Sequence, residues 1–428
     1  MARRKNYDLP KGEGSFYQRS NGLWVGSIVV GVKEDGKPRR VSVSSMDKDT
    51  AWDRLTDRRK DLILNGAPNE GIRDSERLSH WIDTWLDARA GRVRPNTFLT
   101  ERTLLTNWVR PIIGHRPIKE IGPADMRALT QSMMRPREIT RRDGTKRMKA
   151  GLSSTTAHYA QRLLQQVLRE AIAEGYTVSP RALVAPKPLN AVSDRRALTF
   201  DQVEAILRVI ADRPDRSIWI AALLQGMRRG EILGLTWGCV HLDDSVLDVS
   251  WQLQELTRDP DNPSGYLKPP FYETRHLARA FHLTRPKSKA GKRIIPLVPW
   301  MRTELIRWRE VAPTSPYDLV WARDAGPRSR MGDPLRPDVL LAAWKDIQKT
   351  AGVQKGTRAD GSPIYFVLHE ARHTAASLLL AAGVDPEIVK AIMGHSEVVT
   401  TQGYQHADRT MAMKALESVA DMIQLPVA

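Results

Sequence analysis

The hydrophobic pattern changes its period along this 428-residue chain, and stretches rich in proline, glycine or charge mark the changes. Residues 14 to 45 alternate apolar and polar side chains, as strands do, whereas apolar side chains recur at helical spacing from Leu78 onward. The breaks fall at Asn65-Gly66-Ala67-Pro68 and over residues 181 to 197. We therefore expect a multidomain chain, divided into residues 1–66, 74–182 and 195–428.

The first domain is predicted to be a small β-plus-helix module. Strand-like runs flank the turn signal Glu34-Asp35-Gly36, which predicts a hairpin, and a polar helix is expected from about Asp49 to Leu64. Basic side chains lie near the turn, including Lys37, Arg39 and Arg40. They could face phosphates or simply be solvated, and the pattern does not choose between these readings.

The second domain is predicted to be entirely helical. Its helices carry Trp81 and Trp85, then Phe98 to Trp108 with Pro111 as a stop, and later a long helix that begins at Ser153-Ser154-Thr155. The loop before the long helix, residues 135 to 149, holds seven Lys or Arg and two acids. This charge density favours phosphate contacts over plain solvation.

The third domain is predicted to be mainly α with some β structure. Thr199 and Gln202 form a capping-box pattern ahead of an apolar helix. Short strands are expected at Val246 to Ser250, Ala280 to Leu283 and Arg293 to Leu297, and helices follow to the end. The fold class is therefore multidomain: a β-plus-helix module, an all-α domain and an α+β domain.

The amino-acid composition limits the class of binding partner and the cellular compartment that we expect for this protein. Lys and Arg number 66 against 49 Asp and Glu, a formal charge of +17, which favours a polyanionic partner such as nucleic acid. The single cysteine, Cys239, excludes a disulfide framework and a Cys-based metal site. No apolar run of about 18 residues and no apolar leader is present, so we expect an intracellular, cytoplasmic protein without membrane contact.

Three passages of the third domain could carry chemistry: residues 225–231, residues 286–293 and His369-Glu370-Ala371-Arg372-His373. The last is the zinc-protease signature, which requires a further metal ligand. The extended form of that signature is absent, and only a distant Glu387 or Glu397 could serve. Arg372 shares a helical face with His369, which suits an anion better than a dication.

Two further motifs follow, Met393-Gly394-His395-Ser396 and, nine residues after His395, Gly403-Tyr404-Gln405-His406. Together these motifs resemble the tyrosine recombinases of the phage-integrase type, over about residues 199 to 410. The family signature falls on the following residues: Arg228 with its companion Glu231, Lys287, His369, Arg372, His395 and Tyr404. Gln225, Ser288 and Met393 depart from the usual pattern at the level of packing, and residues 251–279 are longer than the family leads us to expect, with no function assigned.

The resemblance implies a mechanism that uses neither a cofactor nor a metal. Arg228 and Arg372 would hold the non-bridging oxygens of the scissile phosphate, and His369 would accept a proton. His395 would donate to an oxygen, Lys287 would protonate the leaving 5′ oxygen, and Tyr404 would become joined to the 3′ phosphate.

The expected function is site-specific recombination by the integrase of a phage or mobile element in a bacterial host. The partners implied are double-stranded attachment sites, a homo-tetramer on a four-way junction, and a directionality factor or host DNA-bending protein. Residues 1–66 and 74–182 resemble the arm-type and core-type DNA-binding domains. Candidate DNA contacts, chosen from charge and from helix starts, are Arg39, Arg40, Arg94, Thr97, Lys149 and Thr155.

Alternatives stay open at this point. A type IB topoisomerase uses much the same residues, the zinc protease needs bound metal, and a DNA-binding regulator would have lost its active site. The helix expected from Asp408 to Ile423, which carries Met411, Ala415, Leu416, Val419 and Met422, could dock on a neighbouring protomer or pack on its own domain.

Overall fold

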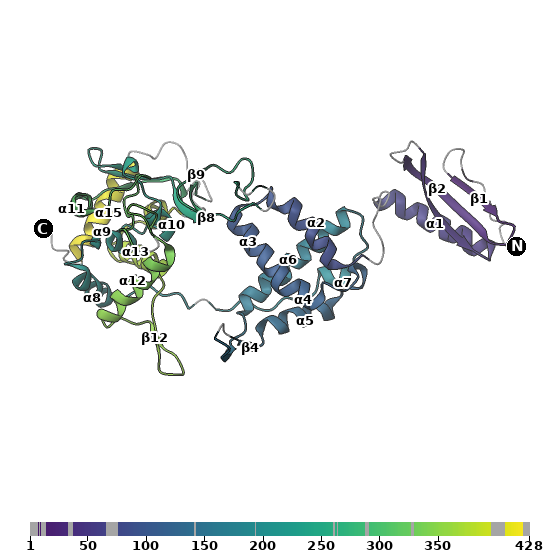
Figure 1. Cartoon of the computed structure of the whole chain (residues 1–428), viewed down its shortest axis with the longest axis horizontal. Helices are drawn as coiled ribbons and strands as arrows, with labels where there is room; N and C mark the ends of the chain where they lie inside the picture. The colour runs from purple at the N-terminus through teal and green to yellow at the C-terminus, as the bar shows by residue number, and fades with distance from the viewer. Residues whose placement is uncertain are drawn as a thin grey trace. The chain divides into compact units, whose positions relative to one another are not determined.

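The computed structural model describes residues 7, 9, 14–32, 37–65, 76–140, 143–192, 194–259, 262, 264–286, 291–326, 329–394 and 407–422 (Figure 1). It divides into two compact units, a first unit of residues 1–89 and 97–191 and a second unit of residues 90–96 and 192–428. The chain therefore folds as a multidomain protein that combines helices with small antiparallel sheets. No helix among the described residues is long and apolar enough to cross a bilayer.

The N-terminal segment forms an antiparallel sheet with a helix on it. Strands β1 (Gly14–Gln18), β2 (Trp24–Val32) and β3 (Pro38–Ser45) lie in the order β1-β2-β3, and α1 (Lys48–Asn65) follows. The predicted hairpin corresponds to β2 and β3, its turn lies outside the described residues, and β1 is an additional strand. A Cβ at Gly26 would lie 2.8 Å from the Leu55 side chain, so glycine lets α1 approach the sheet closely.

The rest of the first unit is a bundle of helices: α2 (Leu78–Ala90), α3 (Pro95–Leu104), α4 (Arg110–Ile113), α5 (Pro123–Met134), α6 (Ser154–Ala173) and α7 (Pro180–Leu183), with a 3₁₀ turn at Ile118–Glu120. Trp81 packs in its core and donates from its indole nitrogen to the Val167 carbonyl at 2.9 Å. Ser153 caps α6 as expected, because its hydroxyl accepts from the Thr156 amide.

The prediction that Pro111 ends its helix is wrong. The helix continues to Ile113, after a π turn over Leu105–Val109 in which the Arg110 amide donates to the Leu105 carbonyl. A proline ring crowds the preceding turn and cannot donate a hydrogen bond. The wider π turn directly before Pro111 relieves both problems, so the proline is accommodated without a break.

The basic segment of residues 135–149, predicted as a loop, contains a two-stranded hairpin of β4 (Arg137–Thr140) and β5 (Lys146–Lys149). Its turn is stabilised by Asp143, whose carboxylate accepts from the amide and hydroxyl of Thr145 at 2.9 and 2.6 Å. Gly144 has a φ of +81°, a conformation that favours glycine. The Asp-Gly pair was therefore the overlooked hairpin signal.

The second unit is built on helices α8 (Phe200–Ile210), α9 (Arg216–Leu223), α10 (Arg229–Leu233), α11 (Pro299–Val311), α12 (Pro337–Thr350), α13 (Leu368–Ala381), α14 (Pro386–Met393) and α15 (Ala407–Met422), with a 3₁₀ turn at Trp237–Cys239. The capping box at α8 is confirmed: the Thr199 hydroxyl accepts from the Gln202 amide, and the Gln202 side chain accepts from the Thr199 amide. Trp219 and Trp344 stack in the core with their ring centres 6.0 Å apart.

Small sheets lie beside these helices. One has the order β8 (Gln252–Glu255), β10 (Phe281–Thr284), β9 (Thr274–His276), and another the order β11 (Arg293–Pro296), β7 (Val246–Val249), β6 (Val240–His241). A short pair joins β12 (Gly356–Thr357) to β13 (Pro363–Ile364). The predicted strands correspond to β7, β10 and β11, while β8 and β9 were missed. The unassigned segment 251–279 supplies both.

The C-terminal helix α15 packs on its own unit. Ala415, Leu416 and Val419 are buried in the same core as α13 and α14, whereas Met411 is exposed. Of the two possibilities stated above, the structure therefore supports packing within the domain. The side chain of Met422 lies outside the described residues.

Candidate active site

A tight turn places Arg228 beside the end of α14. Gly226 has a φ of +61°, and a Cβ there would lie 2.4 Å from the terminal methyl of Met393. Any larger residue would be both strained and crowded against that side chain. The glycine thus brings the chain before α10 against residues 393 and 394, which the sequence places far away.

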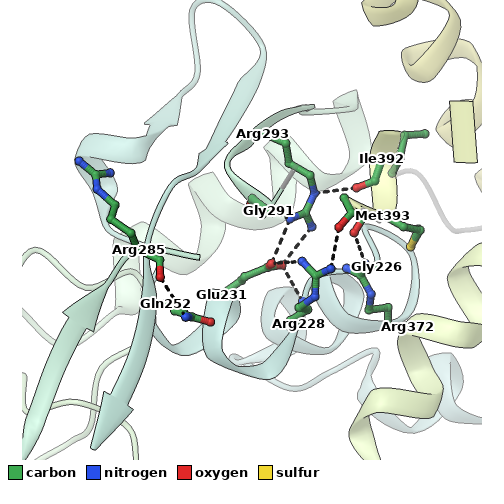
Figure 2. A network of polar contacts seen from close by, with 11 residues as sticks. Gly226, Arg228, Glu231, Gln252, Arg285, Gly291, Arg293, Arg372, Ile392 and Met393 are labelled. Carbon is green, nitrogen blue, oxygen red and sulfur yellow. Dashed lines mark hydrogen bonds and ion pairs between the residues drawn. The ribbon is translucent and has the colours of Figure 1, made fainter. Parts of the chain in front are cut away.

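Glu231 lies at the centre of a polar network (Figure 2). Its carboxylate is buried and accepts from the Arg228 amide at 2.8 Å and from the Arg228 guanidinium at 2.7 Å. Arg293 donates to both of its oxygens at 3.0 Å. Burial opposes ionisation, but Arg293 and Arg228 outweigh it and hold the pKa of Glu231 below its ordinary value.

Arg372 extends from α13 toward the same place, and no carboxylate among the described residues bonds to it. One of its nitrogens donates to the Gly226 carbonyl at 2.6 Å, and another donates to the Met393 carbonyl. Burial, reinforced by the charges of Arg228 and Arg293, lowers the pKa of Arg372 to about 9, so the group is still a cation at neutral pH. A buried cation bonded to carbonyls alone is costly, and an arriving anion would lower that cost.

Arg228 and Arg372 thus donate hydrogen bonds to the carbonyl groups of two adjacent residues. Arg228 donates to the Gly394 carbonyl at 2.8 Å, and Arg372 to the carbonyl of the preceding residue (Figure 2). Arg293 adds a bond to the Ile392 carbonyl at 2.7 Å. Three guanidinium groups from distant parts of the sequence therefore converge on the end of α14, with one buried carboxylate among them. This is an arrangement suited to a phosphate.

His369 lies one turn before Arg372 on α13 and is exposed to solvent. Partial desolvation, together with the neighbouring His373, Arg372, Arg195 and Arg228, lowers the pKa of His369 to about 4. The imidazole is therefore neutral near pH 7, which leaves it able to accept a proton.

The charges around α13 disfavour the interpretation of His369 and His373 as zinc ligands. The rings of His369 and His373 do lie together, 4.9 Å apart, as the signature predicts. Glu370, however, is buried with its carboxylate bonded to Lys355 at 2.7 Å and to the amides of Val367 and Arg196 at 2.8 and 3.1 Å. Desolvation lowers the pKa values of both histidines and the nearby arginines lower them further, and the positive charge of these arginines would also repel a dication.

Lys287, His395 and Tyr404 lie outside the described residues, so their predicted roles have no geometry here. The structure does describe Arg285, two residues before Lys287 in the sequence, and its contacts. Arg285 lies over the Trp251 ring at 3.7 Å and bonds Glu273 through two nitrogens at 2.8 and 3.0 Å. Its carbonyl accepts from Gln252 at 3.2 Å (Figure 2).

The predicted DNA contacts are spread over separate elements. Arg39 and Arg40 lie on β3, Lys149 ends β5, and Thr97 lies in the first turn of α3. Thr155 accepts from the Ala191 amide at 3.0 Å. Arg94 donates to the carbonyls of Arg285 and Pro286 at 3.2 and 3.0 Å. Contact of these residues with DNA stays a prediction.

Sequence reasoning missed Arg293 and Lys355. Arg293 is the last residue of the basic passage 286–293, and the pairing of β11 with β7 brings it to Glu231. A buried carboxylate such as Glu231 requires charged or hydrogen-bonding partners, but the burial of Glu231 and the identity of its second arginine both depend on the fold. Lys355 precedes a very short strand, and nothing in its local pattern indicates a partner.

Comparison with known proteins identifies the class. Residues 196–411 match the phage integrase family, and residues 77–134 match the N-terminal SAM-like domain of phage integrases. An integrase from Saccharopolyspora erythraea is 23% identical over 446 residues, covering 93% of each chain. A XerC-like tyrosine recombinase from Caldanaerobacter subterraneus is 23% identical over 441 residues, covering 99% of this chain and 100% of its own.

Solved structures share the fold. The Tn1549 transposon integrase in complex with a circular intermediate DNA superposes with a TM-score of 0.55 at 20% identity, covering 82% of this chain and 100% of that one. A lambda integrase dimer bound to a core site gives a TM-score of 0.52 at 16% identity, covering 95% and 96%. The chain belongs to the phage integrase family and is a tyrosine site-specific recombinase.

Proposed function

We propose that this recombinase cuts and rejoins DNA through a 3′-phosphotyrosyl intermediate, as the integrase of a phage or mobile element in a bacterial cytoplasm. The convergence of Arg228 and Arg372 on the end of α14 carries the proposal. These two guanidinium groups hold the non-bridging oxygens of the scissile phosphate and stabilise the charge of the transition state. The surplus of positive charge there suits an anionic substrate.

In the proposed step the Tyr404 hydroxyl oxygen bonds to phosphorus, and the bond from phosphorus to the 5′ oxygen breaks. The tyrosine proton passes to neutral His369, while Lys287 protonates the departing 5′ oxygen and His395 donates to a non-bridging oxygen. The phosphotyrosyl ester keeps the energy of the broken bond. Religation to a second strand therefore needs no external energy source.

We further propose that the chain acts as a tetramer on paired double-stranded attachment sites and exchanges strands by way of a four-way junction. A lambda integrase tetramer has been solved on a Holliday junction, with a TM-score of 0.50 to this chain at 17% identity, covering 92% of this chain and 98% of that one. Residues 1–66 and 74–182 act as arm-type and core-type DNA-binding domains in this proposal. A directionality factor or a host DNA-bending protein is a candidate accessory partner.

A covalent trap tests the chemistry. Full-length protein is incubated with EDTA and a nicked duplex that carries the attachment core of its element, then denatured, and protein–DNA adducts are counted. Wild type should form an adduct and Tyr404→Phe should not, whereas Tyr365→Phe is a matched loss of a hydroxyl that should leave the adduct intact. No adduct on a duplex that the protein binds would refute the proposal.

The products then separate recombination from simple relaxation. A recombinase joins strands from two sites, while a topoisomerase of type IB changes only the supercoiling of one plasmid. Products that contain recombined flanks, formed from two labelled sites, are the expected result.

A further inference from the structure

The hairpin β4–β5 has two faces of different charge. In its antiparallel register Arg137 lies opposite Lys149 and Ile139 opposite Arg147, so these four side chains share one face. On the other face Glu138 lies opposite Met148 and Thr140 opposite Lys146. There the charges cancel, because Glu138 and Lys146 form an ion pair at 2.9 Å. The first face, here called the cationic face (Arg137, Arg147, Lys149), carries no acid.

The positive charge of this face is not neutralised within the described protein. Arg147 and Lys149 are exposed, and among the residues that the structure describes neither side chain forms a hydrogen bond or ion pair. Like charges placed opposite each other destabilise a strand pair, and a lone exposed hairpin is marginally stable. The arrangement therefore carries a cost that a bound polyanion would offset.

The base of the hairpin is held firmly. The Leu152 amide donates to the Met133 carbonyl at 2.8 Å, which closes the segment between α5 and α6. A Cβ at Gly151 would lie 1.8 Å from the Met134 carbonyl oxygen, so this close approach requires glycine. Arg137 lies over the ring of Trp108 at 4.5 Å and anchors the first strand to the π turn. Arg147 and Lys149 are thus presented from a fixed platform.

We propose that the cationic face of β4–β5 binds the phosphate backbone of the DNA on which the recombinase acts, an inference that rests on the proposed function. A two-stranded ribbon fits the major groove of B-DNA, and duplex phosphates recur about every 1.7 Å along the axis. Arg147 and Lys149 make the phosphate contacts, while Arg137 holds the ribbon against Trp108. Phosphate contacts carry no base information, so the hairpin adds affinity without sequence preference.

The salt dependence of binding tests this directly. Full-length wild type and variants are titrated, by fluorescence anisotropy, onto an attachment-core duplex and a scrambled duplex from about 50 to 200 mM salt. The test variants are Arg147→Gln and the double variant Arg147→Gln with Lys149→Gln. The matched control is Lys146→Gln, which removes the same charge one residue away on the opposite face.

Each lost phosphate contact should reduce the slope of log affinity against log salt by about 0.9. The double variant should therefore have a slope shallower by about 1.8, so its affinity falls about tenfold less than that of wild type over this range. The reduction should be equal on both duplexes, and Lys146→Gln should keep the wild-type slope. Equal slopes for Arg147→Gln and Lys146→Gln would overturn the proposal, because net charge alone would then explain any loss.

The adduct assay keeps this inference separate from the proposed function. Wild-type adducts together with an unchanged slope in the double variant would overturn the hairpin proposal alone. Circular dichroism melts of the exposed-site variants check that the fold is retained. A melting point like that of wild type is expected, since neither side chain packs in a core.

Discussion

Segments 228–231 and 367–370 of the second unit are built alike. In each, a glutamate three residues into a helix accepts from the backbone amide of the residue before that helix, Glu231 from Arg228 and Glu370 from Val367. In each, the glutamate also holds a cation. Glu231 binds two arginines of the candidate site, whereas Glu370 binds Lys355 and the Arg196 amide, outside the arginine cluster. The same capping contact therefore holds two arginines of the candidate site at the start of α10. At the start of α13 it instead holds Lys355 and the backbone at Arg196.

Replacing Glu231 should cause the largest loss of stability. Glu231→Gln keeps the shape but removes the negative charge between Arg228 and Arg293, leaving Arg293 buried without its ion pair. Breaking a buried pair costs about 3–5 kcal/mol, which calorimetric melting of the full chain would measure. Glu304→Gln, which affects another buried carboxylate with a longer ion pair, 3.3 Å to Arg216, is the control and should cost less. Similar melting points for Glu231→Gln and wild type would show that the ion pairs of Glu231 do not stabilise the fold, and would contradict this prediction.

Arg372→Lys should mainly affect chemistry. An ammonium group cannot make the two divergent bonds to the carbonyls of Gly226 and Met393 while also holding a phosphate oxygen. We expect adduct formation to slow by about 100-fold, with DNA affinity reduced much less. Lys390→Arg, an exposed exchange in the other direction on α14, should leave the rate unchanged. A rate near that of wild type for Arg372→Lys would remove Arg372 from the mechanism.

Glu370→Gln should be milder than Glu231→Gln. The single amide oxygen of glutamine can keep the bond from one of the backbone amides, Val367 or Arg196, while the bond from the other amide and the charge that pairs with Lys355 are lost. A charge-assisted hydrogen bond contributes about 2 kcal/mol, and the double variant with Lys355→Met should recover part of that loss. Additive losses in this double-mutant cycle would contradict a direct ion pair.

The smallest expected effect concerns pH. The folded pKa of His369, about 4, lies below the unfolded value of about 6.5, so the unfolded chain binds more protons between these values. Stability attributable to His369 is therefore present above about pH 6.5 and falls as the pH drops toward 4. His369→Gln should show a shallower acid loss in thermal melts between those values. The exposed His241→Gln should follow wild type.

Sequence patterns predicted what depends on neighbours along the chain. The capping box at Thr199 and the helix start at Ser153 were found because capping is local. Strands β8 and β9 were missed because short polar runs such as Thr274–His276 carry no clear alternation. Pro111 misled for a similar reason, since a π turn leaves no recognised sequence mark.

The candidate site was predicted unevenly. The motifs pointed to Arg228 and Arg372, and the structure brings both to the end of α14. No motif indicated that Arg293 would share Glu231, because their contact depends on how β11 pairs with β7. Sequence also gave no means of telling the two faces of the basic hairpin apart until the register of β4 and β5 was known.

The chain entering the second unit is tied to the helix that carries His369 and Arg372. The Arg196 amide bonds Glu370 at 3.1 Å, and the Leu198 amide bonds the Thr374 hydroxyl at 2.9 Å, so both ties end on α13. In mechanical terms, α13 is the anchorage of this segment. Through these two bonds, tension applied to the chain ahead of residue 196 would reach the helix of the candidate site before it reaches α8, which begins at Phe200.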